Sequence, residues 1–285
     1  MVRGGRERHG ATMRSIIEAI RAAARESEPG SEALESSEDP FGLDLDFRER
    51  VTPLFGLLHD RYWRVEVSGA KNVPTDGPVI LISNHSGALP FDGAMIATSL
   101  DRSPGIVVRY LYDRFVEDVS AVDDFYRRTG GAVAKWENAE RLLEHRSHLL
   151  IFPEGVPGVA KSFTERYQLR SFNPGFARLA MKHDVPIVPI AVVGAEEIYP
   201  MVGRAEHLGK SLGMPYLPIT PFFPLLGLLG TLPLPTKWLI RIGKPIRLPS
   251  SPDVARAERE STVVRRRLQA MVTRLKQRRR SIFLG

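Results

Sequence analysis

The chain has 285 residues, of which 43% are hydrophobic, and its net charge is +7. This length suits one large α/β domain with appended segments, or two small domains. Cysteine is absent, which excludes disulfides, thiolate catalysis and zinc sites built on sulfur. No histidines are paired at metal-ligand spacing beside carboxylates, so we expect neither a bound metal nor a cofactor. The positive charge favours anionic partners, although coding bias in a GC-rich bacterial genome produces the same excess of arginine.

The first forty residues lack the apolar density of a folded core. Residues 13–25 carry isoleucines at helical spacing, and the acidic run 26–39 is rich in Ser, Glu, Pro and Gly. We therefore predict that residues 1–40 form a disordered or loosely helical extension, and that the main domain spans residues 41–250. No secretory signal is visible, which predicts a cytoplasmic protein.

Helical and extended patterns alternate after residue 40. The predicted helices cover residues 46–62, 91–100, 137–146 and 174–182, and the predicted strands cover residues 64–68, 79–83, 105–111, 148–152, 186–193 and 237–242. This alternation predicts an α/β fold, with a largely parallel central sheet flanked by helices, N-terminal helices and a basic C-terminal helix.

Two segments stand outside that alternation. Residues 211–236 carry no charge and are rich in Leu, Phe and Pro, and the prolines at positions 215, 218, 221 and 224 exclude a membrane-spanning helix. This segment could dip into a membrane surface, line a channel for a hydrocarbon chain or cover the core. Residues 251–285 have the pattern of a basic amphipathic helix, which suits either an anionic membrane surface or packing on the domain.

The run 79–92 carries the clearest chemical signal. A buried strand ends in small residues around His85, and a helix begins after a proline with Asp92 in its first turn. This spacing lets the carboxylate orient the imidazole as a general base. A core histidine satisfied by a nearby acid fits the same pattern. A second apolar strand ends in Glu154 and Gly155, which predicts one site at the edge of one sheet, although Pro-Glu-Gly is also ordinary turn chemistry.

Three blocks in this order resemble the glycerolipid (lysophospholipid) acyltransferase superfamily, which includes the 1-acylglycerol-3-phosphate acyltransferases. The blocks are Asn84-His85 with Asp92, Phe152-Pro153-Glu154-Gly155, and Val185-Pro186-Ile187-Val188-Pro189-Ile190, and the resemblance covers residues 65–248. It implies transfer of an acyl group from acyl-CoA or acyl-carrier protein to a lipid hydroxyl, without a covalent intermediate. The catalytic residues it implies are His85 as base and Asp92 as its orienter. The substrate-binding residues it implies are Asn84, Ser86, Gly87, Gly131, Lys135, Glu154 and Gly155, with amides near Gly87 or Gly155 holding the oxyanion.

The sequence departs from the family pattern at two places. Six residues separate His85 from Asp92 where the family usually has four, as in the branch resembling diacylglycerol and phytyl-ester acyltransferases. The usual phosphate-binding arginines are missing: the second block offers Lys135, and the third continues into Val156-Pro157. These departures favour a neutral glyceride, lysolipid or other lipid alcohol over glycerol phosphate. Four arginines could still supply phosphate contacts from other positions: Arg127, Arg128, Arg166 and Arg170.

Two other functions fit the same residues. A thioesterase or lipase-type hydrolase would use His85 on water, and a basic lipid-binding protein would use no catalysis at all. No nucleic-acid-reading motif accompanies the C-terminal arginines, so we expect no nucleic-acid partner. The expected partners are a thioester donor, a lipid acceptor and an anionic membrane surface at the inner face of the cytoplasmic membrane. The oligomeric state stays open, and the other six histidines are expected at the surface.

Overall fold

A seven-stranded sheet forms the centre of the computed structural model, which describes residues 39–86, 91–103, 106–211, 216–250 and 253–284. The strand order is β1-β9-β6-β2-β5-β3-β4. Within the described residues, five of its six strand pairs are parallel and β6–β9 is antiparallel. The strands are β1 (Glu66–Ser68), β2 (Val79–Ser83), β3 (Val108–Tyr112), β4 (Gly131–Val133), β5 (His148–Ile151), β6 (Ile187–Val193) and β9 (Leu239–Ile242). The predicted α/β class with a largely parallel sheet is confirmed.

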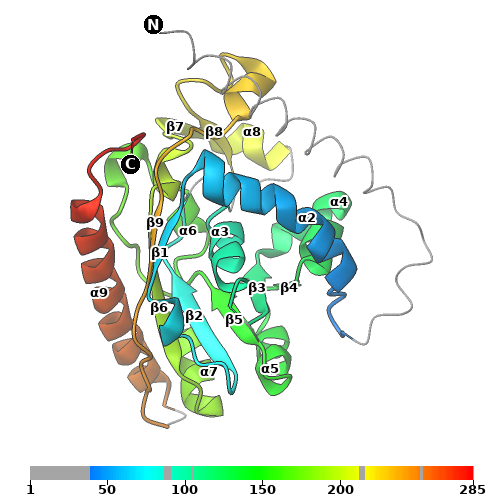
Figure 1. Ribbon diagram of the computed structural model, residues 1–285, viewed down its shortest axis with the longest axis vertical. Coiled ribbons are helices and arrows are strands. Elements are labelled where there is room, and N and C mark those ends of the chain that lie inside the picture. Colours follow the sequence, from blue (N-terminus) through cyan, green and yellow to red (C-terminus); the bar gives the residue numbers. More distant parts are fainter. Residues whose placement is uncertain (1–38, 87–90, 104–105, 212–215, 251–252, 285) are drawn as a thin grey trace, which may run out of the picture.

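Helices cover both faces of this sheet, with α9 along one side and α2 and α3 along the other (Figure 1). A short two-stranded antiparallel sheet, β7 (Gly203–Ala205) and β8 (Leu217–Ile219), lies apart from the main sheet. The helices are α2 (Leu45–Leu57), which continues as the π-helical turn η1 (Leu58–Tyr62), α3 (Phe91–Leu100), α4 (Ser120–Arg128), α5 (Trp136–Glu144), α6 (Val156–Val159), α7 (Gly175–His183), α8 (Glu206–Ser211) and α9 (Val254–Arg278).

The central strands are apolar at almost every position because both of their faces are covered. In β2, Ile80 and Ile82 join one hydrophobic cluster with α5, α7 and α9, whereas Val79 and Leu81 join another with α3. Every residue of β2 and β6 is buried. A continuous apolar run is typical of a parallel strand covered on both faces, which is why residues 79–83 were predicted with their observed bounds.

The basic C-terminal helix uses its apolar stripe to pack on the domain. Val264, Leu268, Val272 and Leu275 of α9 are buried in the cluster that includes α7 and β6. The arginines at positions 266, 267, 274 and 278 are exposed on the outer side. The sequence left open whether residues 251–285 lie on a membrane surface or pack on the domain. Packing on the domain accounts for the apolar stripe.

The sequence patterns did not predict α4 or β4. Phe125 of α4 contacts Phe47 and Phe55 of α2, with ring centroids 5.9 and 6.4 Å apart, and Arg128 lies over Phe47. These contacts join α4 to a helix about 70 residues earlier in the chain. The β4 strand has three residues, which is shorter than an alternating pattern needs.

Of the segment 211–236, residue 211 and residues 216–236 are described, and Leu225, Leu226, Leu229 and Leu232 are exposed. The segment includes β8 and the short 3-10 helix η6 (Gly227–Thr231). Leu225 is 82% exposed and Leu229 is 71% exposed, so covering the core does not account for them. Within the described ranges, no helix combines the length and apolar composition needed to cross a membrane.

The extension predicted for residues 1–40 lies outside the described residues as far as residue 38. At its end, both carboxylate oxygens of Asp39 accept hydrogen bonds from the Arg109 guanidinium. The backbone N–H groups of Phe41 and Leu43 also donate to Asp39. These contacts anchor the start of the described domain to β3.

Candidate active site

His85 follows the carboxyl end of β2, with its ring held on two sides. Its Nδ1 lies 2.8 Å from Oδ2 of Asp92, as the spacing of the two residues predicts. Its ring stacks on Phe152 at the end of β5, with a centroid distance of 4.1 Å and an interplanar angle of 21°. The side chain is 16% exposed, so the ring is fixed but reachable.

Asp92 lies in the first turn of α3 and is completely buried. Besides His85 Nδ1, it accepts hydrogen bonds from the Ser86 N–H at 2.9 Å, the Ser86 hydroxyl at 3.2 Å and the Gly93 N–H at 2.8 Å. An acid that only accepts hydrogen bonds behaves as an ionised carboxylate. Such a carboxylate is suited to holding a proton on Nδ1 of His85, which would leave the Nε2 lone pair available.

Glu154 connects the neighbouring strand end to the same histidine. Its Oε1 accepts a 3.0 Å hydrogen bond from the His85 backbone N–H. Its Oε2 accepts from the Arg170 N–H at 2.8 Å and from the Lys161 ammonium at 3.3 Å. Glu154 thus fixes the backbone of the catalytic candidate, and both of its oxygens are engaged.

Lys161 is the centre of a buried charge cluster behind the site. Its ammonium also lies 3.1 Å from Oε1 of Glu196, and both side chains are at most 5% exposed. The other oxygen of Glu196 accepts from the Tyr167 N–H at 2.8 Å. One ammonium therefore serves two carboxylates. Burial raises the pKa of Glu196 to about 7, although Lys161 opposes this shift.

This raised pKa predicts a stability penalty that depends on pH. An acid whose pKa is higher in the folded state stabilises the fold fully below its unfolded pKa near 4.5, and this stabilisation is lost as the pH rises through about 7. Between pH 4.5 and 7, the wild type should therefore lose about 3 kcal/mol relative to Glu196→Gln. Urea unfolding across this range measures the difference. The control Glu206→Gln, at an exposed position, should run parallel to the wild type, and parallel behaviour of Glu196→Gln would contradict the prediction.

Two glycines allow the turn after Glu154 to lie against His85. Gly155 has φ 56° and ψ −151°, a conformation that other residues rarely adopt, and its N–H donates to the Phe152 carbonyl. That amide is engaged, so the oxyanion-holding role expected of amides near Gly87 or Gly155 stays a prediction. A Cβ on Gly158 would lie 2.7 Å from the Glu154 Cβ and 3.1 Å from the His85 Cβ.

Gly158→Ala is expected to disturb the site more than the stability. The added methyl must displace Glu154 or His85, which their hydrogen bonds resist. We expect kcat/KM to fall by about tenfold or more, and stability to fall by about 1–3 kcal/mol. The control Gly56→Ala adds a methyl to α2 where no atom lies within 4 Å, and it should leave kcat/KM unchanged. Equal activity of the two variants would contradict this account of Gly158.

The other predicted site residues lie in three settings. Asn84 is buried and exchanges two hydrogen bonds with the Val192 backbone, at 3.0 and 2.9 Å, so its side chain joins β2 to β6. The Ser86 hydroxyl points to Asp92. Gly87 lies outside the described residues. Gly131 and Lys135 belong to β4 and the turn after it, three strands from β2 or about 14 Å at ordinary strand spacing.

Gly131 and Lys135 are not among the contacts that surround His85. A Cβ on Gly131 would collide with the rings of Tyr110 and Tyr112, so this glycine allows close packing. Lys135 lies 3.7 Å from Glu117 at the surface. The structure therefore does not bring these two residues to the histidine, and their expected role in substrate binding stays a prediction.

The four arginines considered as phosphate ligands are all paired with carboxylates. Such pairing lowers the free positive charge that a dianionic phosphate requires. The pairs are Arg127–Asp123 at 3.0 Å, Arg128–Asp44 at 2.9 Å, Arg166–Glu197 at 3.8 Å and Arg170–Glu165 at 2.6 Å.

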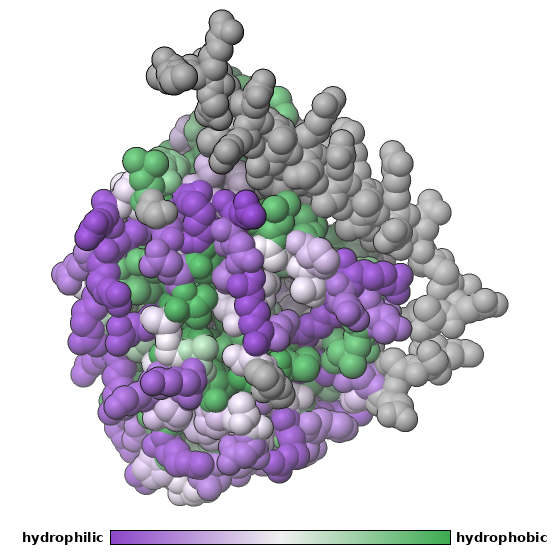
Figure 2. All heavy atoms as spheres, in the orientation of Figure 1, coloured by the Kyte–Doolittle hydropathy of each residue, from purple (hydrophilic) through white to green (hydrophobic). Residues whose placement is uncertain are grey.

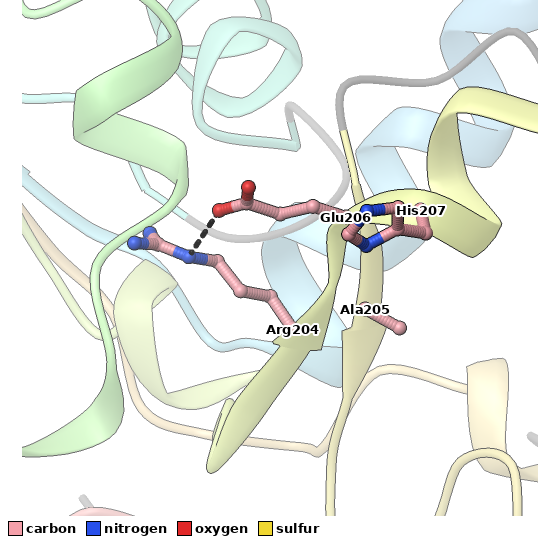
Figure 3. A pocket seen from close by; sticks show the side chains of 4 residues that line it. All are labelled: Arg204, Ala205, Glu206 and His207. Carbon is pink, nitrogen blue, oxygen red and sulfur yellow. Dashed lines mark ion pairs between the residues drawn. The ribbon is translucent and has the colours of Figure 1, made fainter.

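An open hollow of about 470 Å³ lies beside α6, lined by Arg204, Ala205, Glu206 and His207 (Figure 3). Arg204 and Glu206 reach towards each other across it and form a 3.3 Å ion pair. Arg204 also donates to the Ala160 carbonyl at the end of α6. Because Gly158 of the same helix contacts His85, this hollow adjoins the site.

Two of the remaining histidines are buried, which corrects the expectation that all six lie at the surface. His59 lies between Asp60 and Ser99, with ring nitrogens 2.7 and 3.0 Å from their oxygens. His148 lies 2.8 Å from the Pro74 carbonyl oxygen. Among the described residues, no group of three or more His, Cys, Asp or Glu side chains is placed to hold a metal ion.

Sequence reasoning missed the supporting residues Gly158, Lys161 and Glu196. Glu196 follows β6, which neighbours β2 in the sheet, and a polar residue at such a strand end is a signal that could have found it. Lys161 and Gly158 left no signal beyond their closeness to Glu154 in sequence.

Comparison with known proteins decides the family. Residues 64–193 match the acyltransferase family. An uncharacterized protein of Mycobacterium tuberculosis (strain ATCC 25618 / H37Rv) is 38% identical over 261 residues, which cover 87% of this chain and 72% of that protein. The chain belongs to the acyltransferase family. The resemblance read from the three blocks is therefore confirmed.

Named relatives align with about half of this acyltransferase. Mouse 1-acyl-sn-glycerol-3-phosphate acyltransferase alpha is 30% identical over 154 residues, which cover 50% of this chain and 51% of that protein. Phytyl ester synthase 2 of Arabidopsis thaliana is 31% identical over 147 residues, which cover 48% of this chain and 20% of that protein. The crystal structure of the 1-acyl-sn-glycerophosphate (LPA) acyltransferase PlsC from Thermotoga maritima has the same fold, with a TM-score of 0.53, 18% identity and coverage of 92% of this chain and 91% of that one.

Proposed function

We propose that this acyltransferase moves a fatty acyl group from acyl-CoA or an acyl-carrier protein to a hydroxyl of a glycerolipid or other lipid alcohol. The observation that carries the proposal is the 2.8 Å contact between His85 Nδ1 and Asp92 at the carboxyl end of β2. An imidazole oriented in this way, with its second nitrogen free to act as a base, is what removal of a hydroxyl proton needs.

In the proposed reaction, Nε2 of His85 takes the proton of the acceptor hydroxyl as its oxygen attacks the thioester carbonyl carbon. Asp92 stabilises the imidazolium that forms. The carbon–sulfur bond then breaks, and the thiolate leaves and takes up the proton from His85. No covalent acyl-enzyme is needed, because the acceptor attacks the donor directly. Glu154 and Asn84 act through position: the first holds the backbone of His85, and the second holds β2 against β6.

The charges favour a form of this reaction in which the acceptor is a neutral alcohol. The four arginines considered as phosphate ligands are paired with carboxylates, and Lys135 is paired with Glu117 on the distant edge of the sheet. A doubly charged phosphate binds best to fixed cations without such competitors. We therefore propose a glyceride, lysolipid or other lipid alcohol as acceptor, presented at the cytoplasmic face of a membrane.

Product analysis tests this function. The purified protein is incubated with mixed acyl-CoA or acyl-carrier protein donors and a panel of monoacylglycerol, diacylglycerol, lysophospholipid, long-chain alcohol and glycerol phosphate, and mass spectrometry identifies the products. Acyl esters of the uncharged alcohols are expected. Acylation of glycerol phosphate alone would overturn the acceptor class, and release of free acid that no acceptor diverts would indicate a hydrolase.

A further inference from the structure

Apolar side chains are exposed together in the segment before β9 and at the C-terminal end. We call these side chains the apolar rim. In the first segment the exposed fraction reaches 82% at Leu225 and 71% at Leu229, and in the second it reaches 76% at Leu284. The apolar rim consists of Phe222, Leu225, Leu226, Leu229, Leu232, Phe283 and Leu284. An exposed apolar set of this kind marks an interaction surface.

Hydrogen bonds join the C-terminal part of the apolar rim to the chain that follows its first part. Nη2 of Arg64 donates to the Pro235 carbonyl at 3.1 Å and to the Phe283 carbonyl at 2.8 Å. The N–H of Lys237 donates to the Ile282 carbonyl. In Figure 1, the yellow and orange segment before β9 and the C-terminal end both lie in the upper part of the molecule. These bonds tie the chain that leads out of the first part of the rim to the second part.

This surface is attached to the end of the sheet that carries His85. The Thr236 hydroxyl donates to the Gly194 carbonyl, directly after β6. The Leu234 N–H donates to the Ile198 carbonyl. Because β6 pairs with β2, an apolar partner bound at the apolar rim would lie at the active-site end of the molecule.

The charges around the apolar rim select the kind of partner. Residues 211–236 contain no acidic or basic residue, whereas Arg64 donates to the carbonyl of rim residue Phe283, and the exposed Arg280 precedes Phe283 by three residues in the chain. The nearby acid Glu66 is paired with Lys237 at 2.7 Å. In Figure 2, green apolar and purple hydrophilic surface meet in the upper part of this face. Apolar side chains beside cations suit a bilayer with anionic headgroups. A symmetric second copy would bring like charges together.

We propose that the apolar rim inserts into the surface of an anionic lipid bilayer and delivers His85 to acceptors in that bilayer. The role of this docking in bringing His85 to its acceptors rests on the proposed function, but the docking itself requires no catalysis. The inserted side chains are Leu225, Leu226, Leu229 and their neighbours in the rim, and Arg64 and Arg280 meet the headgroups. The prolines and the short helix η6 give this segment a compact shape that lies in the interface without spanning it.

Vesicle sedimentation of the full chain tests the proposal. The wild type, the double variant Leu225→Ser/Leu229→Ser and the control Leu45→Ser/Val254→Ser are mixed with vesicles of phosphatidylcholine, or of equal parts phosphatidylcholine and phosphatidylglycerol. Both control side chains are exposed, at 61% and 48%, and lie outside the rim. The partition coefficient of the rim variant should fall by roughly tenfold or more for each leucine, whereas the control should bind like the wild type.

Two further measurements separate the contribution of charge to vesicle binding from the catalytic activity. Arg280→Ser should weaken binding to the phosphatidylglycerol vesicles by about fivefold and binding to phosphatidylcholine alone very little. On a short-chain acceptor dissolved without vesicles, the rim variant should keep the wild-type kcat/KM, so loss of docking and loss of catalysis remain distinguishable. Wild-type binding by the rim variant, or no wild-type binding to either vesicle, overturns the proposal. A rim variant that changes only from dimer to monomer in sedimentation velocity overturns it in favour of a second copy.

Discussion

His85→Ala is expected to lower kcat/KM for acyl transfer by about 10³-fold or more, because the reaction loses the base that takes the acceptor proton. The folded structure should tolerate the change, since the ring is partly exposed and makes its polar contact with Asp92 alone among the contacts described above. Initial rates of thiol release with acyl-CoA and a lipid alcohol measure the loss. Thermal unfolding of the same preparation shows whether the variant remains folded.

The chain offers a matched control in its second histidine–aspartate pair. His59 lies 2.7 Å from Asp60 and 3.0 Å from the Ser99 hydroxyl, but it is buried between η1 and α3, and burial lowers its pKa. His59→Ala should reduce stability while leaving kcat/KM of the folded enzyme unchanged. As a further test of the same idea, Asp92→Asn should lower kcat/KM by about 10²-fold or more, because the imidazolium loses its counter-charge. Normal turnover by His85→Ala, or an equal loss in His59→Ala, would refute the assignment of the base.

The part of the site that could be predicted from the sequence is the part that is local in the chain. The bounds predicted for β2 and α3 agree with the structure, because the strand is an unbroken buried run and a proline precedes the helix. The two elements bring together His85 and Asp92, which are seven residues apart in the chain. No long-range information is needed to predict that contact.

The part that could not be predicted depends on contacts between distant residues. Lys161 and Glu196 are 35 residues apart, and their ion pair exists because the turn after β5 and the turn after β6 meet behind the histidine. Gly131 and Lys135 show the converse: they match a family block in sequence but lie at the edge strand β4, and their expected role in substrate binding stays a prediction. A motif fixes the order of residues along the chain, but not the distance between the strands that carry them.

Lys161→Met is expected to be the most destabilising of the substitutions considered. It leaves Glu154 and Glu196 buried next to each other without their shared ammonium. Removal of one partner from a buried ionic group costs about 3–5 kcal/mol, and urea unfolding at neutral pH measures this cost. The variant should also lose about tenfold or more in kcat/KM, because Glu154 holds the His85 backbone and moves when its charge is unpaired.

A double variant separates the electrostatic explanation from a simple packing defect. In Lys161→Met/Glu196→Gln, one of the two uncompensated carboxylates is removed, so stability and kcat/KM should both recover part of what Lys161→Met loses. The control Lys182→Met removes the surface ion pair with Glu140 and should cost at most about 1 kcal/mol. If the double variant is no more stable than Lys161→Met, the loss comes from the cavity left by the lysine. If both lysine variants cost the same, the buried cluster has no special role, and Glu154 must hold His85 through its two backbone hydrogen bonds alone.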